Sequence, residues 1–152
     1  MKIRQADRSD YDELALIMFE AVRKGSSSYS EEQRAAWVPE IRHGDEWNAR
    51  LDRQSVFVAE SDALLCGFLS CDADGYIDLA FVRPSAQKQG VFRRLYEQVE
   101  LHARQVLLKR LWVHASFNAF PAFTATGFNV VEEQTVEIRS QRLKRYEMEK
   151  FL

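Results

Sequence analysis

The chain of 152 residues is poor in several residue types that would mark it as a specialised class of protein. It has two cysteines, three prolines and three histidines. Cys66 and Cys71 lie five residues apart in an expected strand, so their side chains point to opposite faces and we expect no disulfide between them. Three histidines far apart in the sequence argue against a dedicated metal site, and we expect no metal.

Neither sign of charge dominates the chain, which has 21 Lys and Arg against 23 Asp and Glu and a net charge of −2. A dedicated nucleic-acid-binding protein usually has a strong basic excess, so we expect no nucleic-acid partner. No apolar run approaches the length of a membrane span, and the N-terminus has no basic segment followed by an apolar one. We therefore expect a cytoplasmic protein without a membrane partner.

The remaining composition, 46% hydrophobic and 29% charged, is typical of one globular domain over residues 1–152. Hydrophobic periodicity predicts a first helix that begins at a capping-box-like Ser9-x-x-Asp12 and ends before Gly25. The order of elements predicts an α/β fold, a mixed and twisted central sheet flanked by helices on both faces. The expected strands are 2–6, 56–59, 64–70, 75–82, 110–115, 129–138 and 142–150, and the other expected helices are 31–37, 45–52, 90–107 and 119–126.

Residues 82–92 connect an apolar strand to a helix through a loop with glutamines, a lysine and one glycine. The first turn of a helix has unpaired N–H groups and the positive end of the helix dipole, so it suits a phosphate. Gly90 allows an anion to approach the backbone closely, and Lys88 adds a nearby cation. The alternative is an ordinary connection between a strand and a helix.

This loop resembles the acetyl-CoA pyrophosphate loop of the GNAT superfamily of N-acetyltransferases, whose pattern is Gln/Arg-x-x-Gly-x-Gly/Ala. Gln87, Gly90 and Phe92 occupy the three marked positions, and the bulky Phe92 departs from the usual small residue. Residues 116–128 resemble the family's later segment Asn-x-x-Ala-x-x-x-Tyr-x-x-x-Gly-Phe at the same spacing. The resemblance covers nearly the whole chain and is strongest to a poorly characterised bacterial subgroup.

The resemblance implies acetyl-CoA as co-substrate, held where the fourth and fifth strands of the sheet splay apart. In the family a backbone N–H of the strand before the loop polarises the thioester, and a Tyr near the thiolate donates a proton. Phe123 stands at that Tyr position and has no proton to donate. Ser116 stands where an Asn often binds the pantetheine arm, although it could simply cap a helix. The implied cofactor-binding residues are Ala80, Phe81, Val82, Gln87, Lys88, Gln89, Gly90, Val91, Phe92, Arg93, Ser116 and Phe123.

Three residues are candidates for the catalytic base. Tyr76 and Asp78 share one face of the cofactor-side strand, and burial would raise the pKa of Asp78 towards a useful range. A carboxylate paired with a neighbouring Arg is the alternative for Asp78. His114 titrates near neutrality but could be structural. Tyr29 and Trp37 lie in the segment that lines the family's acceptor pocket, although aromatic residues at this spacing also occur in cores.

The sequence therefore predicts an acetyl-CoA-dependent N-acetyltransferase that acts on a primary amine of a small molecule or peptide. Direct transfer in a ternary complex is favoured, because no Cys occupies the cofactor-side strand as a covalent carrier. The alternative is a non-catalytic acyl-CoA-binding or sensor protein of the same fold, suggested by Phe92 and Phe123. The closing strands offer an edge through which two copies could form a homodimer.

Overall fold

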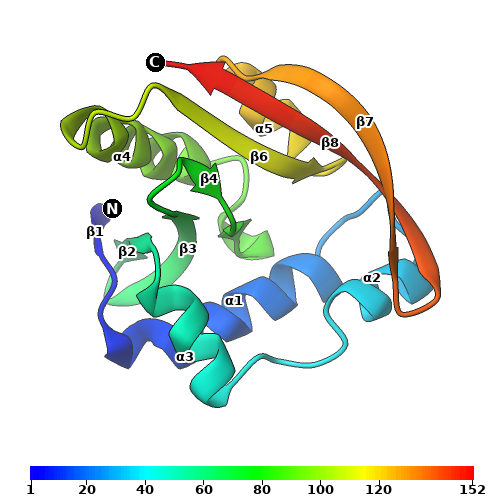
Figure 1. Ribbon diagram of the computed structural model, residues 1–152. Helices are drawn as coiled ribbons and strands as arrows, with labels where there is room; N and C mark the ends of the chain where they lie inside the picture. Colours follow the sequence, from blue (N-terminus) through cyan, green and yellow to red (C-terminus); the bar gives the residue numbers. More distant parts are fainter.

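The computed structural model describes residues 1–152 and divides the expected mixed sheet into two four-stranded halves (Figure 1). The first half has the order β1-β2-β3-β5 and is antiparallel throughout. The second has the order β4-β6-β8-β7, in which β4 is parallel to β6 and the other pairs are antiparallel. The predicted α/β fold with a mixed sheet is thus confirmed. The strands are β1 (Lys2–Gln5), β2 (Ser55–Ser61), β3 (Leu64–Cys71), β4 (Tyr76–Ile77), β5 (Ala80–Val82), β6 (Arg110–Ser116), β7 (Asn129–Ile138) and β8 (Gln141–Phe151).

The prediction of one continuous strand over residues 75–82 was wrong. The segment forms β4 and β5, with a break at Asp78 and Leu79. At this break the N–H of Leu79 donates to the hydroxyl of Ser70 at 3.0 Å rather than to a backbone carbonyl. A side chain on β3 therefore replaces one bond of the ladder, which no local pattern in residues 75–82 indicates.

The break lets two neighbouring strands separate. β4 pairs with β6 through Tyr76 opposite Trp112 and Ile77 opposite Val113. Beyond the break, β5 pairs only with β3, so its other edge and the end of β6 are not joined by strand pairing. This opening between β5 and β6 agrees with the splayed strands that the resemblance implied.

Five α-helices cover the sheet (Figure 1). α1 and α3 contribute to the core on one face, and α4 and α5 contribute to the core on the other. Along β2, Val56 and Val58 pack in one core cluster with α1 and α3, while Phe57 and Ala59 pack in the other with α4. This alternation is what period two along a strand produces when both faces are buried. The helices are α1 (Tyr11–Arg23), α2 (Glu31–Trp37), α3 (Gly44–Asp52), α4 (Val91–Gln105) and α5 (Phe120–Ala125).

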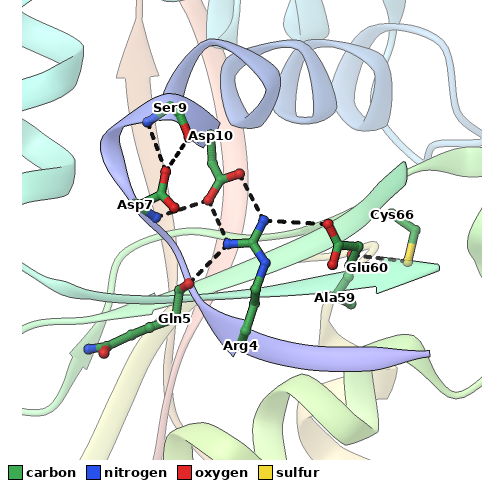
Figure 2. A network of polar contacts seen from close by, with 8 residues as sticks. All are labelled: Arg4, Gln5, Asp7, Ser9, Asp10, Ala59, Glu60 and Cys66. Carbon is green, nitrogen blue, oxygen red and sulfur yellow. Dashed lines mark hydrogen bonds and ion pairs between the residues drawn. The ribbon is translucent and has the colours of Figure 1, made fainter. Parts of the chain in front are cut away.

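The start of the first helix differs from the expected Ser9-x-x-Asp12 box. The capping box is formed by Asp7 and Asp10 around a short 3₁₀ turn, Arg8–Asp10, that precedes α1. Figure 2 shows why: Arg4 of β1 holds both oxygens of Asp10, at 2.8 and 3.0 Å. The same arginine lies 3.6 Å from Glu60 of β2. This ion-pair network fixes the helix start to the edge of the sheet.

The long β7–β8 hairpin arches from α5 to α2 and closes one side of the molecule (Figure 1). Two side-chain bonds join it to α2: Gln33 donates to the carbonyl of Arg142 at 2.8 Å, and Arg139 donates to the carbonyl of Ala36 at 2.7 Å. The hairpin is therefore anchored to α2 and forms one wall of the molecule. None of the helices has both the length and the apolar character that crossing a membrane requires.

Candidate functional site

The larger of two relevant cavities, about 560 Å³, occupies the opening between β5 and β6 and reaches the start of α4. Its charged lining residues are Lys88 and Arg93, and no Asp or Glu lines it. The cavity is therefore positive and otherwise mainly apolar. It is lined by Ala21, Val22, Ser26, Trp37, Ala80, Phe81, Val82, Ala86, Gln87, Lys88, Gly90, Val91, Phe92, Arg93, Ser116, Asn118, Ala119, Pro121, Ala122, Ala125 and Thr126.

The N-terminus of α4 lies at this cavity without a side-chain cap. Gly90 precedes the helix in the left-handed region, with φ of +80°, and no side chain caps the first turn. The N–H groups of that turn have no carbonyl partner within the helix, so they carry partial positive charge. Lys88 also has a positive φ of 62°, which gives the loop its tight path. This end of the cavity is built to receive an anion.

The two glutamines of the loop bind the loop itself. Gln87 donates to the carbonyl of Val82 at 3.2 Å, and Gln89 donates to the carbonyl of Ser85 at 3.2 Å. Gln87 still lines the larger cavity, whereas Gln89 does not. Gln89 was predicted to bind the cofactor, but in the structure its side chain stabilises the loop and does not line the cavity.

The free edge of β5 presents backbone N–H groups to the larger cavity. Arg83 donates its N–H to the carbonyl of Cys66 at 2.9 Å, so that N–H faces β3. Because N–H direction alternates along a strand, Ala80 and Val82 direct their N–H groups to the opposite edge, towards the opening. These two residues line the cavity and can polarise a carbonyl placed there.

The two aromatic departures from the family pattern lie together. Phe123 is almost fully buried and does not line the cavity, while the half-buried Phe92 does. Their ring centroids are 5.0 Å apart, and Phe123 also packs on Phe128 at 5.1 Å. Phe123 is therefore a core residue whose edge towards the cavity is covered by Phe92. Ser116 lines the cavity and accepts the N–H of Ala119 at 3.1 Å, so both of its expected roles are compatible.

The smaller cavity, about 310 Å³, lies on the other side of the break between β4 and β5. Three residues, Trp37, Phe81 and Ser116, line both cavities, so the two meet at this point. The smaller cavity is lined by Met18, Tyr29, Trp37, Val38, Arg42, Arg50, Tyr76, Asp78, Leu79, Phe81, His114, Ser116, Val136, Ile138, Arg139, Leu143, Lys144 and Arg145.

Asp78 lies in the smaller cavity but is engaged by other side chains. Arg50 of α3 donates to both of its oxygens, at 2.8 and 2.9 Å, and Gln54 donates at 2.8 Å. Burial raises the pKa of Asp78, but the hydrogen bonds and charge of Arg50 outweigh burial and hold the pKa below its ordinary value. The expectation of a raised pKa was wrong, and the alternative of an Arg pair describes Asp78.

Tyr76 and His114 form the remaining polar pair in the smaller cavity. The hydroxyl of Tyr76 lies 3.0 Å from Nδ1 of His114, and Nε2 of His114 lies 3.7 Å from Glu147 of β8. Burial and the charge of Arg145 lower the pKa of His114, so the imidazole is neutral at pH 7. A neutral imidazole beside a hydroxyl can take a proton from a group bound in the cavity.

Tyr29 and Trp37 occupy different positions in the smaller cavity. Tyr29 is buried; its hydroxyl donates to the carbonyl of Lys144 at 2.5 Å and accepts the N–H of Phe117 at 2.9 Å. Its polar group is thus used in joining the loop before α2 to the second half-sheet. Trp37 is partly exposed and separates the two cavities, where it can contact a bound molecule.

Sequence reasoning missed two sets of lining residues. Asn118 lines the larger cavity and fixes the loop before α2 through bonds with Ser28 and Ser27, at 3.0 and 2.8 Å. The smaller cavity has arginines from α3, the α2–α3 connection and the β7–β8 hairpin, which converge only in the folded chain. The run of basic residues from Arg139 to Arg145 was the one feature of the sequence that could have indicated this positive cavity. No group of three or more His, Cys, Asp or Glu side chains is arranged to hold a metal ion.

Comparison with known proteins gives a consistent result. A family model described as acetyltransferase (GNAT) domain matches residues 26–150. An uncharacterized N-acetyltransferase of Escherichia coli K12, YafP, is 33% identical over 142 residues, covering 91% of this chain and 88% of that protein. An uncharacterized N-acetyltransferase of Archaeoglobus fulgidus is 28% identical over 125 residues, covering 74% of this chain and 82% of that protein.

Solved structures agree in fold. A GCN5-related N-acetyltransferase from Rhodopseudomonas palustris, also named a class-II aminotransferase, has a TM-score of 0.90 and 27% identity, covering 99% of this chain and 95% of that one. The putative acetyltransferase yncA from Salmonella typhimurium, solved with its cofactor acetyl-CoA, has a TM-score of 0.70 and 20% identity, covering 99% and 93%.

Proposed function

This chain belongs to the GNAT family of acetyltransferases, and we propose that it transfers the acetyl group of acetyl-CoA to a primary amine. The observation that carries the proposal is the larger cavity, which joins the opening between β5 and β6 to the uncapped start of α4. A long cofactor with phosphates at one end and a thioester at the other fits this arrangement.

In the proposed complex the pyrophosphate of acetyl-CoA lies at the first turn of α4. Backbone N–H groups from Lys88 to Phe92 bind it, and Lys88 and Arg93 add positive charge. The pantetheine arm follows the opening past Ser116. This arrangement brings the thioester to the place where the two cavities meet, beside Trp37 and Phe81.

The free N–H groups of Ala80 and Val82 would hold the thioester oxygen. Negative charge develops on that oxygen when the amine attacks, and fixed donors in a poorly solvated site stabilise it. Neither Cys66 nor Cys71 lines either cavity, and burial raises the pKa of Cys71 to about 12. Direct attack by the amine is therefore favoured over a covalent thiol intermediate.

The amine approaches from the smaller cavity, where Tyr76 and His114 are the proposed proton acceptors. The lone pair of the amine nitrogen forms the new C–N bond, and the C–S bond breaks with its electrons on sulfur. The proton released by the nitrogen passes to His114, directly or through the Tyr76 hydroxyl. Asp78 instead positions Arg50 at the wall of the cavity.

Phe123 supplies no proton to the departing thiolate, and this observation favours the second candidate, a non-catalytic acyl-CoA-binding protein. The two candidates differ in turnover. A thiol-release assay with acetyl-CoA and a panel of primary amines should give amine-dependent CoA release if the chain is an enzyme. Binding of acetyl-CoA by calorimetry with no release for any amine would instead support the binding protein.

A cytoplasmic location stays a prediction, as does a peptide or small-molecule acceptor. A homodimer through the edge strand β7 is a further prediction, supported by the exposed Val130 and Val131 on that strand. Analytical ultracentrifugation at several concentrations would test the homodimer.

A further inference from the structure

The smaller cavity is strongly positive. Four arginines and one lysine from three separate segments line it, whereas Asp78 is the only acidic residue in its lining. That carboxylate is already paired with Arg50 in a two-point ion pair. The remaining positive charges therefore face the cavity without a negative partner in its lining. They belong to Arg42, Arg139, Lys144 and Arg145.

Arg42 has no hydrogen bond or ion pair to any protein group, and its buried Nε lacks a partner. The nearest acidic residues in the sequence, Glu40, Asp45 and Glu46, are exposed, and none of them forms an ion pair with Arg42. Burial and the charges of Arg139 and Arg50 lower the pKa of Arg42. The guanidinium of Arg42 is therefore available to pair with an anion bound in the cavity.

Two further arginines use only neutral partners. Arg139 donates to the carbonyl of Ala36 at 2.7 Å, and Arg145 donates to the amide oxygen of Gln134 at 3.0 Å. Neither forms an ion pair, so their charges add to that of Arg42 around the same space. Converging positive charge of this kind attracts an anion and strengthens its binding.

Much of the remaining lining is apolar, with Met18, Val38, Val136, Ile138 and Leu143 among its members, while Tyr76, His114 and Ser116 supply its neutral polar groups. A volume of about 310 Å³ is at the lower end of the range for small-molecule sites. The occupant therefore has a small apolar body as well as an anionic group. Its amine must lie at the other end, where Trp37 and Ser116 join the cavity to the cofactor.

We propose that the acceptor is a small amino acid, whose amine is acetylated and whose carboxylate binds Arg42 with support from Arg139. This inference rests on the proposed acetyl transfer and names its substrate class. The planar guanidinium offers two N–H donors in the geometry that a carboxylate accepts. The carboxylate supplies the missing partner of Arg42 and relieves the repulsion among the arginines.

Binding of the reaction products tests the carboxylate separately from catalysis. Calorimetry with CoA-loaded protein compares N-acetyl-L-leucine with N-isopentylacetamide, and N-acetyl-L-phenylalanine with N-phenethylacetamide, each pair differing by the carboxylate. We expect the acid of at least one pair to bind about 10- to 100-fold more tightly, the gain typical of hydrogen bonds to a charged group. Equal affinities within both pairs would overturn the proposal.

Arg42→Gln should abolish that preference while leaving binding of the neutral amides unchanged. Its Tm should equal or exceed that of the wild type, because the substitution removes an uncompensated charge and no hydrogen bond. The matched control is Arg142→Gln, which removes an exposed arginine of the β7–β8 hairpin that does not line the cavity. A preference retained in Arg42→Gln, or lost equally in Arg142→Gln, contradicts the assignment.

Thiol release with leucine, isopentylamine, phenylalanine and phenethylamine completes the test. Faster acetylation of the amino acids, lost in Arg42→Gln, is the expected result. Equal acetylation of amino acids and their decarboxylated amines would reject the carboxylate site while retaining the acetyltransferase. Tight binding of the N-acetyl acids without release of thiol from any amine would retain the anion site and reject the proposed catalysis.

Discussion

The ring of Phe92 meets the ring of Phe123 edge to face, with centroids 5.0 Å apart and an interplanar angle of 82°. Each residue replaces a different one in the family pattern: Phe92 a small residue, and Phe123 a tyrosine. The two departures from the pattern are therefore in direct contact. The side chain of Phe92, in the loop before α4, lies between the Phe123 ring and the larger cavity.

This contact predicts a coupled effect of substitution. Phe123→Tyr should destabilise the protein by about 1–3 kcal/mol, because the added hydroxyl enters a buried aromatic cluster without a partner. Combining Phe123→Tyr with Phe92→Ala should cost less than the sum of the two single changes, since the smaller residue opens the edge of ring 123 to the cavity. Urea denaturation of the four proteins measures the coupling, and strict additivity would contradict it.

Gly90→Val should weaken CoA binding at least tenfold, because a branched side chain is strained at a φ of +80° and stands at the proposed phosphate site. Gly90→Ala is the matched control, which places only a Cβ at the same positive φ with less strain and less bulk, and should retain more affinity. Calorimetry with CoA checks both. Wild-type affinity in a folded Gly90→Val protein would move the phosphates away from α4.

His114→Gln should reduce kcat by about 100- to 10,000-fold, the range of general acid–base assistance, with little change in acetyl-CoA affinity. The pKa of His114 lies below its ordinary 6.5, so the base is neutral at pH 7 and kcat should fall only as the pH drops through that lowered pKa. The variant should lack this acidic limb. Tyr76→Phe reports whether the proton passes through the hydroxyl 3.0 Å away. A limb that persists in His114→Gln excludes His114 as the base.

Asp78→Asn should act mainly on stability. It removes one charge of a partly buried ion pair and leaves Arg50 unpaired, at a cost of about 1–3 kcal/mol at pH 7. The loss should be smaller when Arg50→Gln is already present, as a double-mutant cycle would measure. A variant with wild-type stability and a large loss of kcat would restore Asp78 as the base.

Glu100 predicts an acid-sensitive contribution to stability. Burial raises its pKa, but bonds from Lys150 at 2.6 Å and Tyr96 at 2.7 Å prevail and lower the pKa from 4.5 to about 2. The folded pKa is below the unfolded one, so this stabilisation is present above pH 4.5 and is lost as the pH falls to about 2. Glu100→Gln should therefore be less stable at pH 7 and similar to wild type near pH 2. Urea midpoints across this range, with the exposed Glu97→Gln as control, measure the difference.

Local sequence patterns placed most elements. The helix predicted at residues 31–37, before the breaks at Pro39 and Gly44, has the observed bounds of α2, and β7 was predicted at residues 129–138. These segments depend on local spacing and on burial of one face. The errors arose where a side chain from another strand determines the backbone conformation. Arg4 of β1 binds Asp10 and so sets the residue at which the first helix begins. Ser70 of β3 accepts the N–H of Leu79 and so interrupts the strand before β5.

In the candidate site too, the parts that are contiguous in the sequence could be predicted, and the parts assembled from distant segments could not. The loop of residues 82–92 is contiguous, so the sequence alone could predict it as an anion site, and in the structure it lines the larger cavity. Whether the pKa of Asp78 is raised or lowered depends on Arg50, which is 28 positions away in the sequence. The sequence pattern could therefore not decide between a catalytic base and a carboxylate paired with an arginine. The cationic cavity is assembled from the α2–α3 region and the β7–β8 hairpin, whose meeting is a property of the tertiary fold.

Trp37, Phe81 and Ser116 are the only residues that line both cavities. In the proposed complex, the cavity for acetyl-CoA and the cavity for the amine are therefore built from almost separate parts of the chain. Of these two cavities, the β7–β8 hairpin lines only the smaller, so we expect changes of length or charge at its tip to leave the loop before α4 in place. Exchanging that hairpin should therefore change which amine is preferred while binding of acetyl-CoA is retained.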